Sequence, residues 1–496
     1  MIPITDVQTM RICDAKTIES GTSGIELMAR AGRGIYESFD WKGPVAIVCG
    51  SGNNAGDGYV LALALLDAGI DCTLVHLFER FSSDGKYYFD QCVARGIKSV
   101  SYTSDFSFAP YREIVDCIFG TGFSGEVKGS VKEVIQRINE SGKTVVSADI
   151  NSGLNGDNGL TSLCVKSDLT VSIGRRKTGH FLGDAADVIG SLSNIDIGIR
   201  FPSASVYLCE GEDFTDVLGT RKRNSHKGSY GYVAVIGGCR EYSGAVKLAN
   251  MSAASLRAGC GVAQLAIPDA ISESVSPYLL ESTLLPMASD SDGHMKYDPA
   301  LLDSLLLRMS AIAIGMGWGK GNANEAILAH LLEHGKIPLV IDADGLNTLA
   351  SMDLELLKKT RCRVTLTPHP KEFERLCGVP VGEILTRPIF YAENFARLYG
   401  VTVLLKGCTT VITDGSVTYL VDKGCTGMAT AGSGDVLSGI LVGLLGYASS
   451  CAKTVACGAY IAGRAGELAQ MKVGAISMIA SDTVANISNA VNEMVQ

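Results

Sequence analysis

Short runs of apolar, largely β-branched residues alternate with amphipathic segments along this chain. In the first 200 residues these runs predict strands at residues 45–49, 72–77, 114–119, 144–150 and 169–173. Helical periodicity covers residues 5–39, 59–68, 86–95 and 131–140. Strands that alternate with helices of about 10–15 residues are typical of βαβ units, which form a parallel sheet covered by helices. We therefore expect ligands at the carboxyl ends of these strands.

The periodicity breaks between residues 196 and 224, where Pro202, Gly211, Gly219 and a basic run interrupt it. It resumes with predicted strands at residues 232–237, 262–267, 311–315, 338–342, 363–368 and 401–406. Predicted helices of this half cover residues 243–258 and 324–334, then 389–399, and a last one starts at 434. The sequence thus predicts an α/β protein of two domains, residues 1–210 and 211–496, the first a Rossmann-like three-layer αβα fold.

The composition of the chain bears on three properties: binding to nucleic acid, insertion into a membrane, and the redox state of the cysteines. The net charge is −9, and the basic run 221–223 is the densest one, so we expect no nucleic-acid partner. No apolar run reaches the roughly 18 residues of a membrane span, and residues 1–20 lack a signal-peptide pattern. The 15 cysteines are dispersed without a C-x-x-C pair, which favours reduced thiols and a cytoplasmic location.

The most informative segment is Ala429-Thr-Ala-Gly-Ser-Gly-Asp435, which opens a predicted helix. Small residues allow close approach of a ligand, and the free N–H groups of a helix start attract anions. A carboxylate beside a bound phosphate can accept a proton from an attacking hydroxyl, so Asp435 is a candidate base. No G-x-x-x-x-G-K-[ST] loop occurs, and close packing of a helix start is the structural alternative.

The first half carries a comparable turn, residues 50–58, between a predicted strand and a helix. Its glycines fit the dinucleotide pattern G-x-G-x-x-G/A, which is a weak signal by itself. Asn53 and Asn54 add amides that can bind a cation or a phosphate, and Asp57 adds a carboxyl group. An Asn-rich helix cap remains the alternative.

Further oxygen donors follow the next strands. Together with Asn54, the side chains of Asp116 and Ser152 form a candidate site for a monovalent cation. Asp149 is a candidate for acid–base chemistry, and Lys177 for contact with a phosphate or a carbonyl group. Taken singly, each of these residues is equally consistent with a turn cap or a solvated charge.

Residues 8–200 resemble the NAD(P)H-hydrate epimerases in four motifs: G-x-G-N-N-x-G-D-G, V-D-x-x-x-G-T-G, D-I-x-S-G-L and the stretch 170–179. The resemblance implies potassium at Asn54, Asp116 and Ser152, with Asp149 and Lys177 catalytic. It implies that the hydrated nucleotide contacts Asn53, Asn54, Ala55, Gly56, Asp57, Gly120, Thr121, Gly122, Phe123, Ser124, Gly125 and Glu126. Ala55 and Asn151 depart from the usual Gly and Pro of the family.

Residues 215–490 resemble the ribokinase-like ADP/ATP-dependent NAD(P)H-hydrate dehydratases, through S-H-K-G-x-Y-G, D-A-D-x-L-N, T-P-H-P-x-E and M-A-T-x-G-S-G-D. Under this resemblance Asp435 is the base, and Met316 replaces a frequent Pro. The hydrated substrate would contact Gly317, His369, Pro370, Lys371 and Glu372. The adenine nucleotide would contact Lys406, Gly407, Cys408, Thr409, Thr410, Met428, Ala429, Thr430, Ala431, Gly432, Ser433 and Gly434.

The two resemblances together imply repair of hydrated NADH and NADPH. The first domain would interconvert the two C6 epimers, and the second would phosphorylate the C6 hydroxyl of the S epimer so that it leaves. We expect ADP as phosphoryl donor, giving AMP and phosphate, with Mg²⁺ on the nucleotide. We also expect a homo-oligomer. Two alternatives stay open: a small-molecule kinase of the ribokinase class, and a non-catalytic nucleotide-binding or partner-binding first half.

One motif points elsewhere. His330, Glu333 and His334 spell H-x-x-E-H, which matches an inverted zinc-protease pattern. The motif closes an amphipathic helix and lacks an obvious third ligand, so we expect a structural helix end.

Overall fold

The computed structural model describes residues 1–254, 257–449 and 451–495. The chain divides into two compact units. The N-terminal unit comprises residues 3–204, and the C-terminal unit comprises residues 1–2 and 205–496. The two units are described separately.

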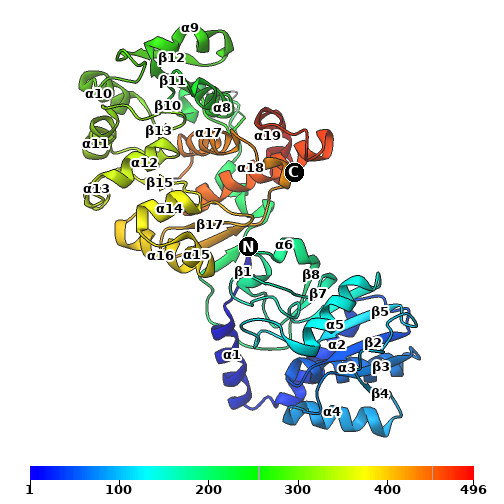
Figure 1. The fold of residues 1–496 in the computed structure, drawn as a ribbon. Coiled ribbons are helices and arrows are strands. Elements are labelled where there is room, and N and C mark those ends of the chain that lie inside the picture. Colours follow the sequence, from blue (N-terminus) through cyan, green and yellow to red (C-terminus); the bar gives the residue numbers. More distant parts are fainter. Residues whose placement is uncertain (255–256, 450, 496) are drawn as a thin grey trace. The chain divides into compact units, whose positions relative to one another are not determined.

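The N-terminal unit is built on a parallel sheet in the order β4-β3-β2-β5-β6-β7-β8 (Figure 1). Its strands are β2 (Val45–Cys49), β3 (Cys72–His76), β4 (Lys98–Ser101), β5 (Glu113–Cys117), β6 (Thr144–Ala148), β7 (Ser167–Ile173) and β8 (Ile189–Ile195). β2 pairs with both β3 and β5, so the direction of winding reverses between β2 and β5. Such a reversal opens a crevice at the carboxyl ends of the two strands, where ligands of this fold bind.

Helices cover both faces of this sheet, as the sequence pattern predicts. Alternate residues of β2 point to opposite faces: Val45 and Ile47 pack with α1–α3, whereas Ala46 and Val48 pack with α5. The helices are α1 (Val7–Glu19), α2 (Gly24–Glu37), α3 (Asn53–Asp67), α4 (Ser83–Ala94), α5 (Gly129–Glu140) and α6 (Ala185–Val188).

Two predicted helices differ from the structure. The segment expected as one helix over residues 5–39 is two helices, because Ser23 caps a new helix with its side chain on the N–H of Glu26. The helix expected from residue 59 already begins at Asn53. The turn residues Asn53, Asn54 and Asp57 therefore lie within the first turns of α3.

The larger sheet has 11 strands in the order β1-β9-β18-β17-β16-β15-β14-β13-β10-β11-β12, and all of them except β1 lie wholly within the C-terminal unit. Its strands are β1 (Ile2–Ile4), β9 (Val206–Leu208), β10 (Tyr232–Ile236), β11 (Val262–Pro268), β12 (Thr283–Met287), β13 (Ala311–Ile314), β14 (Leu339–Ile341), β15 (Val364–Leu366), β16 (Thr402–Leu405), β17 (Thr410–Thr413) and β18 (Thr418–Val421). β10 to β16 pair in parallel, whereas β16, β17 and β18 form an antiparallel meander that the sequence analysis did not predict.

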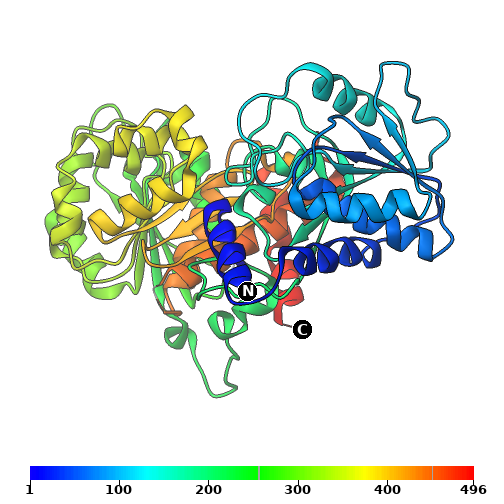
Figure 2. The ribbon, with the colours of Figure 1, turned by 90° about the horizontal axis from the view of Figure 1, so that it is seen from below.

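One core of this unit lies between the sheet and four helices, α8 (Ser243–Ala254), α17 (Ser433–Leu445), α18 (Ala452–Val473) and α19 (Ala480–Val495). Within this unit, a second set of helices gathers on the other side of the strands (Figures 1 and 2). They are α10 (Pro299–Arg308), α11 (Asn324–His334), α12 (Asp344–Ser351), α13 (Glu355–Lys359), α14 (Pro370–Cys377), α15 (Val381–Thr386) and α16 (Pro388–Tyr399); the short α7 (Thr215–Leu218) and α9 (Ser272–Val275) complete the set. The helix predicted over residues 243–258 is described as far as Ala254, residues 255–256 lie outside the described part of the chain, and residues 257–258 form a turn.

Across the described residues, none of the helices combines the length and the apolar character that crossing a bilayer requires.

Candidate active sites

The N-terminal unit has a cavity of about 630 Å³ at the carboxyl ends of β2, β5 and β6. Ten of the predicted site residues line it: Asn53, Asn54, Asp57, Gly120, Thr121, Gly122, Phe123, Ser124, Asp149 and Lys177. Ala55 and Gly56 are buried in α3, and neither they nor Gly125 and Glu126 are part of the cavity lining. Arg11, Asp14 and Asp84 also line the cavity, and the sequence analysis did not assign them.

The start of α3 forms one wall of this cavity. Its N-cap is Gly52, which contributes no side-chain hydrogen bond, so the first N–H groups of the helix remain available to an anionic ligand. A Cβ atom on Gly50 would lie 1.9 Å from the carbonyl oxygen of Ile118, so only glycine fits where the ends of β2 and β5 approach each other.

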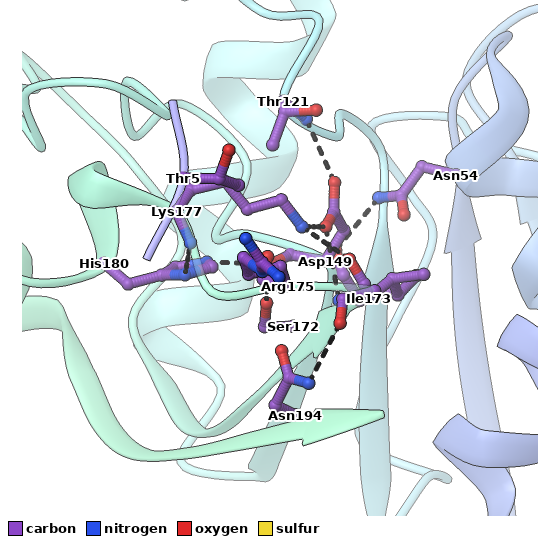
Figure 3. Close-up of polar contacts among 12 residues, drawn as sticks. Thr5, Asn54, Thr121, Asp149, Ser172, Ile173, Arg175, Lys177, His180 and Asn194 are labelled. Atoms are coloured by element: carbon purple, nitrogen blue, oxygen red, sulfur yellow. Dashed lines mark hydrogen bonds and ion pairs between the residues drawn. The ribbon is translucent and has the colours of Figure 1, made fainter. Parts of the chain in front are cut away.

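Asp149 and Lys177 form a buried ion pair beside the cavity (Figure 3). Lys177 Nζ donates to Asp149 Oδ1 at 2.5 Å and to the carbonyl of Ile173 at 2.8 Å, and the lysine side chain is fully buried. The other carboxylate oxygen of Asp149 accepts a bond from the N–H of Thr121 at 3.3 Å. The structure thus brings together the two residues predicted to be catalytic, from loops 28 positions apart.

The backbone of Asp149 is in a left-handed conformation, with φ of 64°. Such a conformation is costly for a residue with a side chain, and it persists when neighbours hold it. His180 holds it here: its Nδ1 accepts from the N–H of Lys177 at 3.0 Å, so Nε2 carries the proton and donates to the Asp149 carbonyl at 2.9 Å. Burial and the nearby Lys177 lower the pKa of His180 to about 4, which keeps the ring neutral. His180 was not among the predicted site residues; its place three residues after Lys177 is the sequence signal that could have identified it.

The carboxyl groups of this cavity differ in their acidity. Burial would raise the pKa of Asp149, but Lys177 outweighs burial, and the pKa is lowered. For Asp57 the balance is reversed: burial, followed by repulsion from Asp149 and Asp14, outweighs the attraction of Lys177 and raises its pKa well above the usual range. The cavity therefore faces one carboxylate held in its charged form and one carboxyl group that favours its neutral form.

The three predicted cation ligands are close to one another at the ends of β5 and β6. Asp116 is fully buried and accepts bonds from the hydroxyl of Ser152 at 2.5 Å, from its N–H at 2.8 Å, and from the hydroxyl of Ser147 at 3.1 Å. Asn54 donates to the carbonyls of Phe119 and Ala148. Its Oδ1 is buried and has no hydrogen-bond partner among the described residues, so an oxygen ligand is left over for a cation.

The residues that depart from the family patterns fit their surroundings. Asn151, in place of Pro, is fully buried, donates to the Val165 and Val188 carbonyls and accepts from the Thr170 hydroxyl at 2.5 Å. Ala55 and Met316 are buried apolar residues. Asn151 therefore finds partners for its amide, and neither Ala55 nor Met316 adds a polar side chain to the turn that carries it.

The second site lies at the strand ends of the C-terminal unit. Lys406, directly after β16, donates to Asp342 Oδ1 at 3.0 Å, and Ser438 of α17 donates to Asp342 Oδ2 at 2.7 Å. Glu372 Oε2 lies 4.0 Å from Lys406 Nζ. Burial would lower the pKa of Lys406, but the Asp342 and Glu372 carboxylates outweigh it and raise that pKa. Asp342 and Ser438 thus join a site to which the sequence analysis gave them no role.

Asp435 stands in the first turn of α17, within reach of these charges. The N-cap Gly432 has φ of 95° and provides no side-chain cap, so the helix start is open to an anion. A Cβ atom on Gly434 would lie 3.5 Å from Lys406 Nζ and 3.7 Å from Asp342 Oδ2, which places the helix start beside the Lys406–Asp342 pair. Burial, and then repulsion from Asp342, raises the pKa of Asp435 to about 7. A carboxyl group with this pKa is suited to accept a proton near neutral pH.

The loops after β13, β14 and β15 lie around this centre. His369 caps α14 through its Nδ1, and the side chain of Glu372 accepts from the His369 N–H at 2.9 Å, so both predicted contacts belong to a capping box. Pro370 is the first residue of α14, and Lys371 is exposed on it. The turn at Gly317 is tied down by Asp344, whose Oδ2 accepts from the N–H of Gly319 at 2.8 Å.

The remaining predicted contacts lie in two connections. Gly407, Cys408 and Thr409 join β16 to β17, where Thr410 begins; Gly407 and Cys408 are exposed and Thr409 is buried. The turn that ends at Met428 leads through Ala429, Thr430 and Ala431 into α17, and the hydroxyl of Ser433 donates to the carbonyl of Met428 at 2.8 Å.

The H-x-x-E-H residues sit at the end of α11. His330 is buried, and its two ring nitrogens contact Tyr297 and Asp303, each at 3.0 Å. Both nitrogens are therefore engaged in a structural contact, as expected for a helix end.

Both halves of the chain match known protein families. A family model described as NAD(P)H-hydrate dehydratase matches residues 233–489, and one described as YjeF-related protein N-terminus matches residues 24–179. The bifunctional NAD(P)H-hydrate repair enzyme Nnr of Moorella thermoacetica is 34% identical over 92% of this chain and 90% of its own length. The chain belongs to the family of bifunctional NAD(P)H-hydrate repair enzymes.

Further relatives extend this result to the whole chain. The bifunctional NAD(P)H-hydrate repair enzyme Nnr of Coxiella burnetii is 33% identical over 97% of this chain and 98% of its own length. Among solved structures, a ribokinase-like superfamily protein from Enterococcus faecalis has a TM-score of 0.51 and 22% identity, and it covers 60% of this chain and 99% of its own. The ribokinase-like fold expected from the sequence is thereby confirmed.

Proposed function

We propose that this protein repairs hydrated NADH and NADPH with two active sites. The N-terminal site interconverts the R and S epimers, and the C-terminal site returns the S epimer to NAD(P)H, with ADP converted to AMP and phosphate. The chain belongs to this repair family, and each unit has a lysine–aspartate pair at its strand ends: Lys177 with Asp149, and Lys406 with Asp342. Beside each pair stands a second carboxyl group whose pKa is raised, Asp57 in the first unit and Asp435 in the second. This shared arrangement is the observation that carries the proposal.

The chemistry of dehydration explains why a kinase-like site is used. Hydroxide is a poor leaving group, whereas phosphate is a good one. Asp435 takes the proton of the C6 hydroxyl as its oxygen attacks the phosphoryl group, and Lys406 and the open start of α17 compensate the phosphate charge. Loss of phosphate from C6 and of a proton from C5 then restores the double bond.

Epimerisation requires that the C6–O bond breaks and re-forms on the other face of the ring. Asp57, which favours its neutral form, donates a proton to the departing hydroxyl, and Asp149 stabilises the cationic ring that results. Water then adds to the opposite face, and its proton returns to Asp57. Lys177 keeps Asp149 charged throughout this cycle.

Two cations fit these sites. Potassium would be held by the free Oδ1 of Asn54 with Asp116 and Ser152, where it would neutralise the buried carboxylate and fix the loops around the substrate. Mg²⁺ would accompany ADP. Three carboxyl groups repel one another near the start of α17, those of Asp342, Asp344 and Asp435, and Lys406 is the cation close to them. A further cation would therefore relieve the remaining repulsion.

The decisive test follows the absorbance of reduced nicotinamide after the protein is mixed with racemic NADH hydrate, ADP, Mg²⁺ and K⁺. Full recovery together with release of inorganic phosphate is expected. With Asp149→Ala, we expect only the S share to recover rapidly. A stable phosphate ester without recovery would instead identify a small-molecule kinase, and recovery of one epimer by the unaltered protein would make the N-terminal half a binding module.

The same preparation tests the remaining expectations. Replacement of ADP by ATP, and of NADH hydrate by NADPH hydrate, measures the two preferences. We propose a homo-oligomer, which sedimentation velocity would detect. A cytoplasmic location is supported by the 15 cysteines, among which the structure shows no disulfide bond.

A further inference from the structure

Two loops of the C-terminal unit bring a thiol, a carboxylate and an imidazole together outside both proposed active sites. Cys239 and Glu241 follow β10, and His294 follows β12. The ligand atoms of these three side chains all lie within 4.8 Å of one another. In the described part of the chain, this is the one such group of three that can bind a metal ion.

His294 is already oriented toward the cysteine. A Cβ atom built on Gly319 would lie 3.0 Å from Cys239 Sγ and 3.2 Å from His294 Nε2, so these two atoms face the same small space above a glycine. The other ring nitrogen, Nδ1, lies 3.8 Å from Asp290 Oδ1. Asp290 is itself fixed, because the same oxygen accepts from the N–H groups of His294 at 2.9 Å and Asp292 at 3.0 Å.

This arrangement matches the construction of protein zinc sites. A histidine that binds zinc through one nitrogen commonly has a carboxylate behind the other nitrogen, which orients the ring. Thiolate, imidazole and carboxylate together are a ligand set that zinc prefers, whereas magnesium and calcium prefer oxygen atoms alone. We propose that Cys239, Glu241 and His294 bind one Zn²⁺ ion, with Asp290 positioning His294 and a water molecule completing the tetrahedron.

The ion would link the loops after β10 and β12 beside a turn of the proposed dehydratase site. Gly319, above which the site lies, belongs to the turn that contains Gly317. A Cβ atom on Gly317 would lie 2.5 Å from the carbonyl oxygen of Tyr242, so the turn packs directly on the loop that carries Cys239 and Glu241. On binding, the Cys239 thiol releases its proton to solvent, and the zinc ion holds the loops after β10 and β12 together, with the turn after β13 packed against them.

The experiment uses the full-length, metal-free protein and Co²⁺ as a spectroscopic substitute for zinc. We expect one Co²⁺ per chain, with tetrahedral visible bands and a thiolate-to-cobalt charge-transfer band, and displacement of Co²⁺ by Zn²⁺. Cys239→Ser should abolish the charge-transfer band, and His294→Gln should weaken binding at least a hundredfold. Asp290→Asn should weaken it about tenfold to a hundredfold, as expected for a partner that orients the ligand.

Matched variants and a second readout separate this site from the others. Cys451→Ser and His334→Gln alter an exposed cysteine and an exposed histidine elsewhere in the unit, and both should bind Co²⁺ as the unaltered protein does. Zn²⁺ should raise the melting temperature of the unaltered protein and leave that of Cys239→Ser unchanged. Absence of the charge-transfer band, or its persistence in Cys239→Ser, would overturn the proposal. Neither readout depends on repair activity, so failure of the proposed function would leave this result standing.

Discussion

The two active sites use the same residue types in the same topological place, yet they arrange the charges differently. In the N-terminal site Lys177 is fully buried and pairs with the carboxylate of Asp149, the residue whose backbone has a positive φ. In the C-terminal site Lys406 is partly exposed and pairs with Asp342, while Asp435 stands apart with a pKa near 7. One site therefore holds its loop carboxylate permanently charged, and the other leaves its proton acceptor free to titrate.

The difference follows from the chemistry proposed for each site. A carboxylate that stabilises a cationic ring is most useful when it never protonates, and a buried lysine ensures this. A base that takes a hydroxyl proton and later releases it works best with a pKa near the working pH. Both sites also contain a non-glycine residue with positive φ, Asp149 at 64° and Ala343 at 49°, the two examples among the described residues. Local strain thus accompanies the site in each unit.

The largest expected effect comes from removing the titrating base. Asp435→Asn should lower the dehydration rate about 10³-fold, within the range for loss of a general base, and leave epimerisation unchanged. Single-turnover recovery of nicotinamide absorbance measures the first rate, and proton NMR of the epimers measures the second. Glu333→Gln, an exposed acid-to-amide change on α11, is the control and should retain both rates. Dehydration at the normal rate in Asp435→Asn would show that another group is the base.

The buried pair of the N-terminal site should respond in stability as well as in activity. Lys177→Met leaves Asp149 buried and unpaired, which we expect to cost about 3 kcal/mol and to remove most epimerase activity. Hydrogen exchange of β6 and β7 reports the stability of this unit. The double variant Asp149→Asn/Lys177→Met should regain much of the stability but none of the activity; additive losses would show that the two residues do not act as a pair.

The pH dependence of the two reactions should differ. With a pKa of about 7 for Asp435, the ionised fraction rises roughly tenfold between pH 6 and pH 8, so the dehydration rate should rise by about the same factor. Asp149 has a lowered pKa and stays charged over this range. The stability that the Asp149–Lys177 ion pair contributes is fully present above the pKa of an unfolded aspartate, near 3.9, and it is lost only as the pH falls below that value. A flat dehydration profile under single-turnover conditions would contradict the assignment of Asp435.

The smallest expected effect tests the backbone of Asp149. His180→Ala removes the bond from Nε2 to the Asp149 carbonyl, and we expect a loss in epimerase kcat of roughly tenfold with a normal dehydration rate. Because the His180 ring is neutral well above its pKa of about 4, the unaltered enzyme should show no titration of this residue near neutral pH. His334→Ala changes an exposed histidine and is the comparison. Equal kcat values for the two variants would mean that the loop holds Asp149 without His180.

Much of the architecture was predictable from local patterns. Buried β-branched runs predicted the central parallel strands, because strands covered on both faces read as continuous apolar segments. The parallel edge strands β4, β8 and β12 were not predicted, since they are largely exposed or half-buried. The small-residue turn before Asp435 predicted the start of α17 to within one residue, whereas the start of α3 was predicted at residue 59 and lies at Asn53. The antiparallel strands β17 and β18 were missed, because short half-buried strands carry a weak signal.

The sequence by itself determined the order of the strands along the chain, the residue types at their ends and the family to which the chain belongs. Only the tertiary structure decided which of those side chains meet. The pairing of Lys177 with Asp149, of Lys406 with Asp342, and of His180 with a strained carbonyl depends on which strands become neighbours in the sheet. The acidity of each carboxyl group follows from these contacts and from burial, and neither is encoded in the spacing of residues along a single segment.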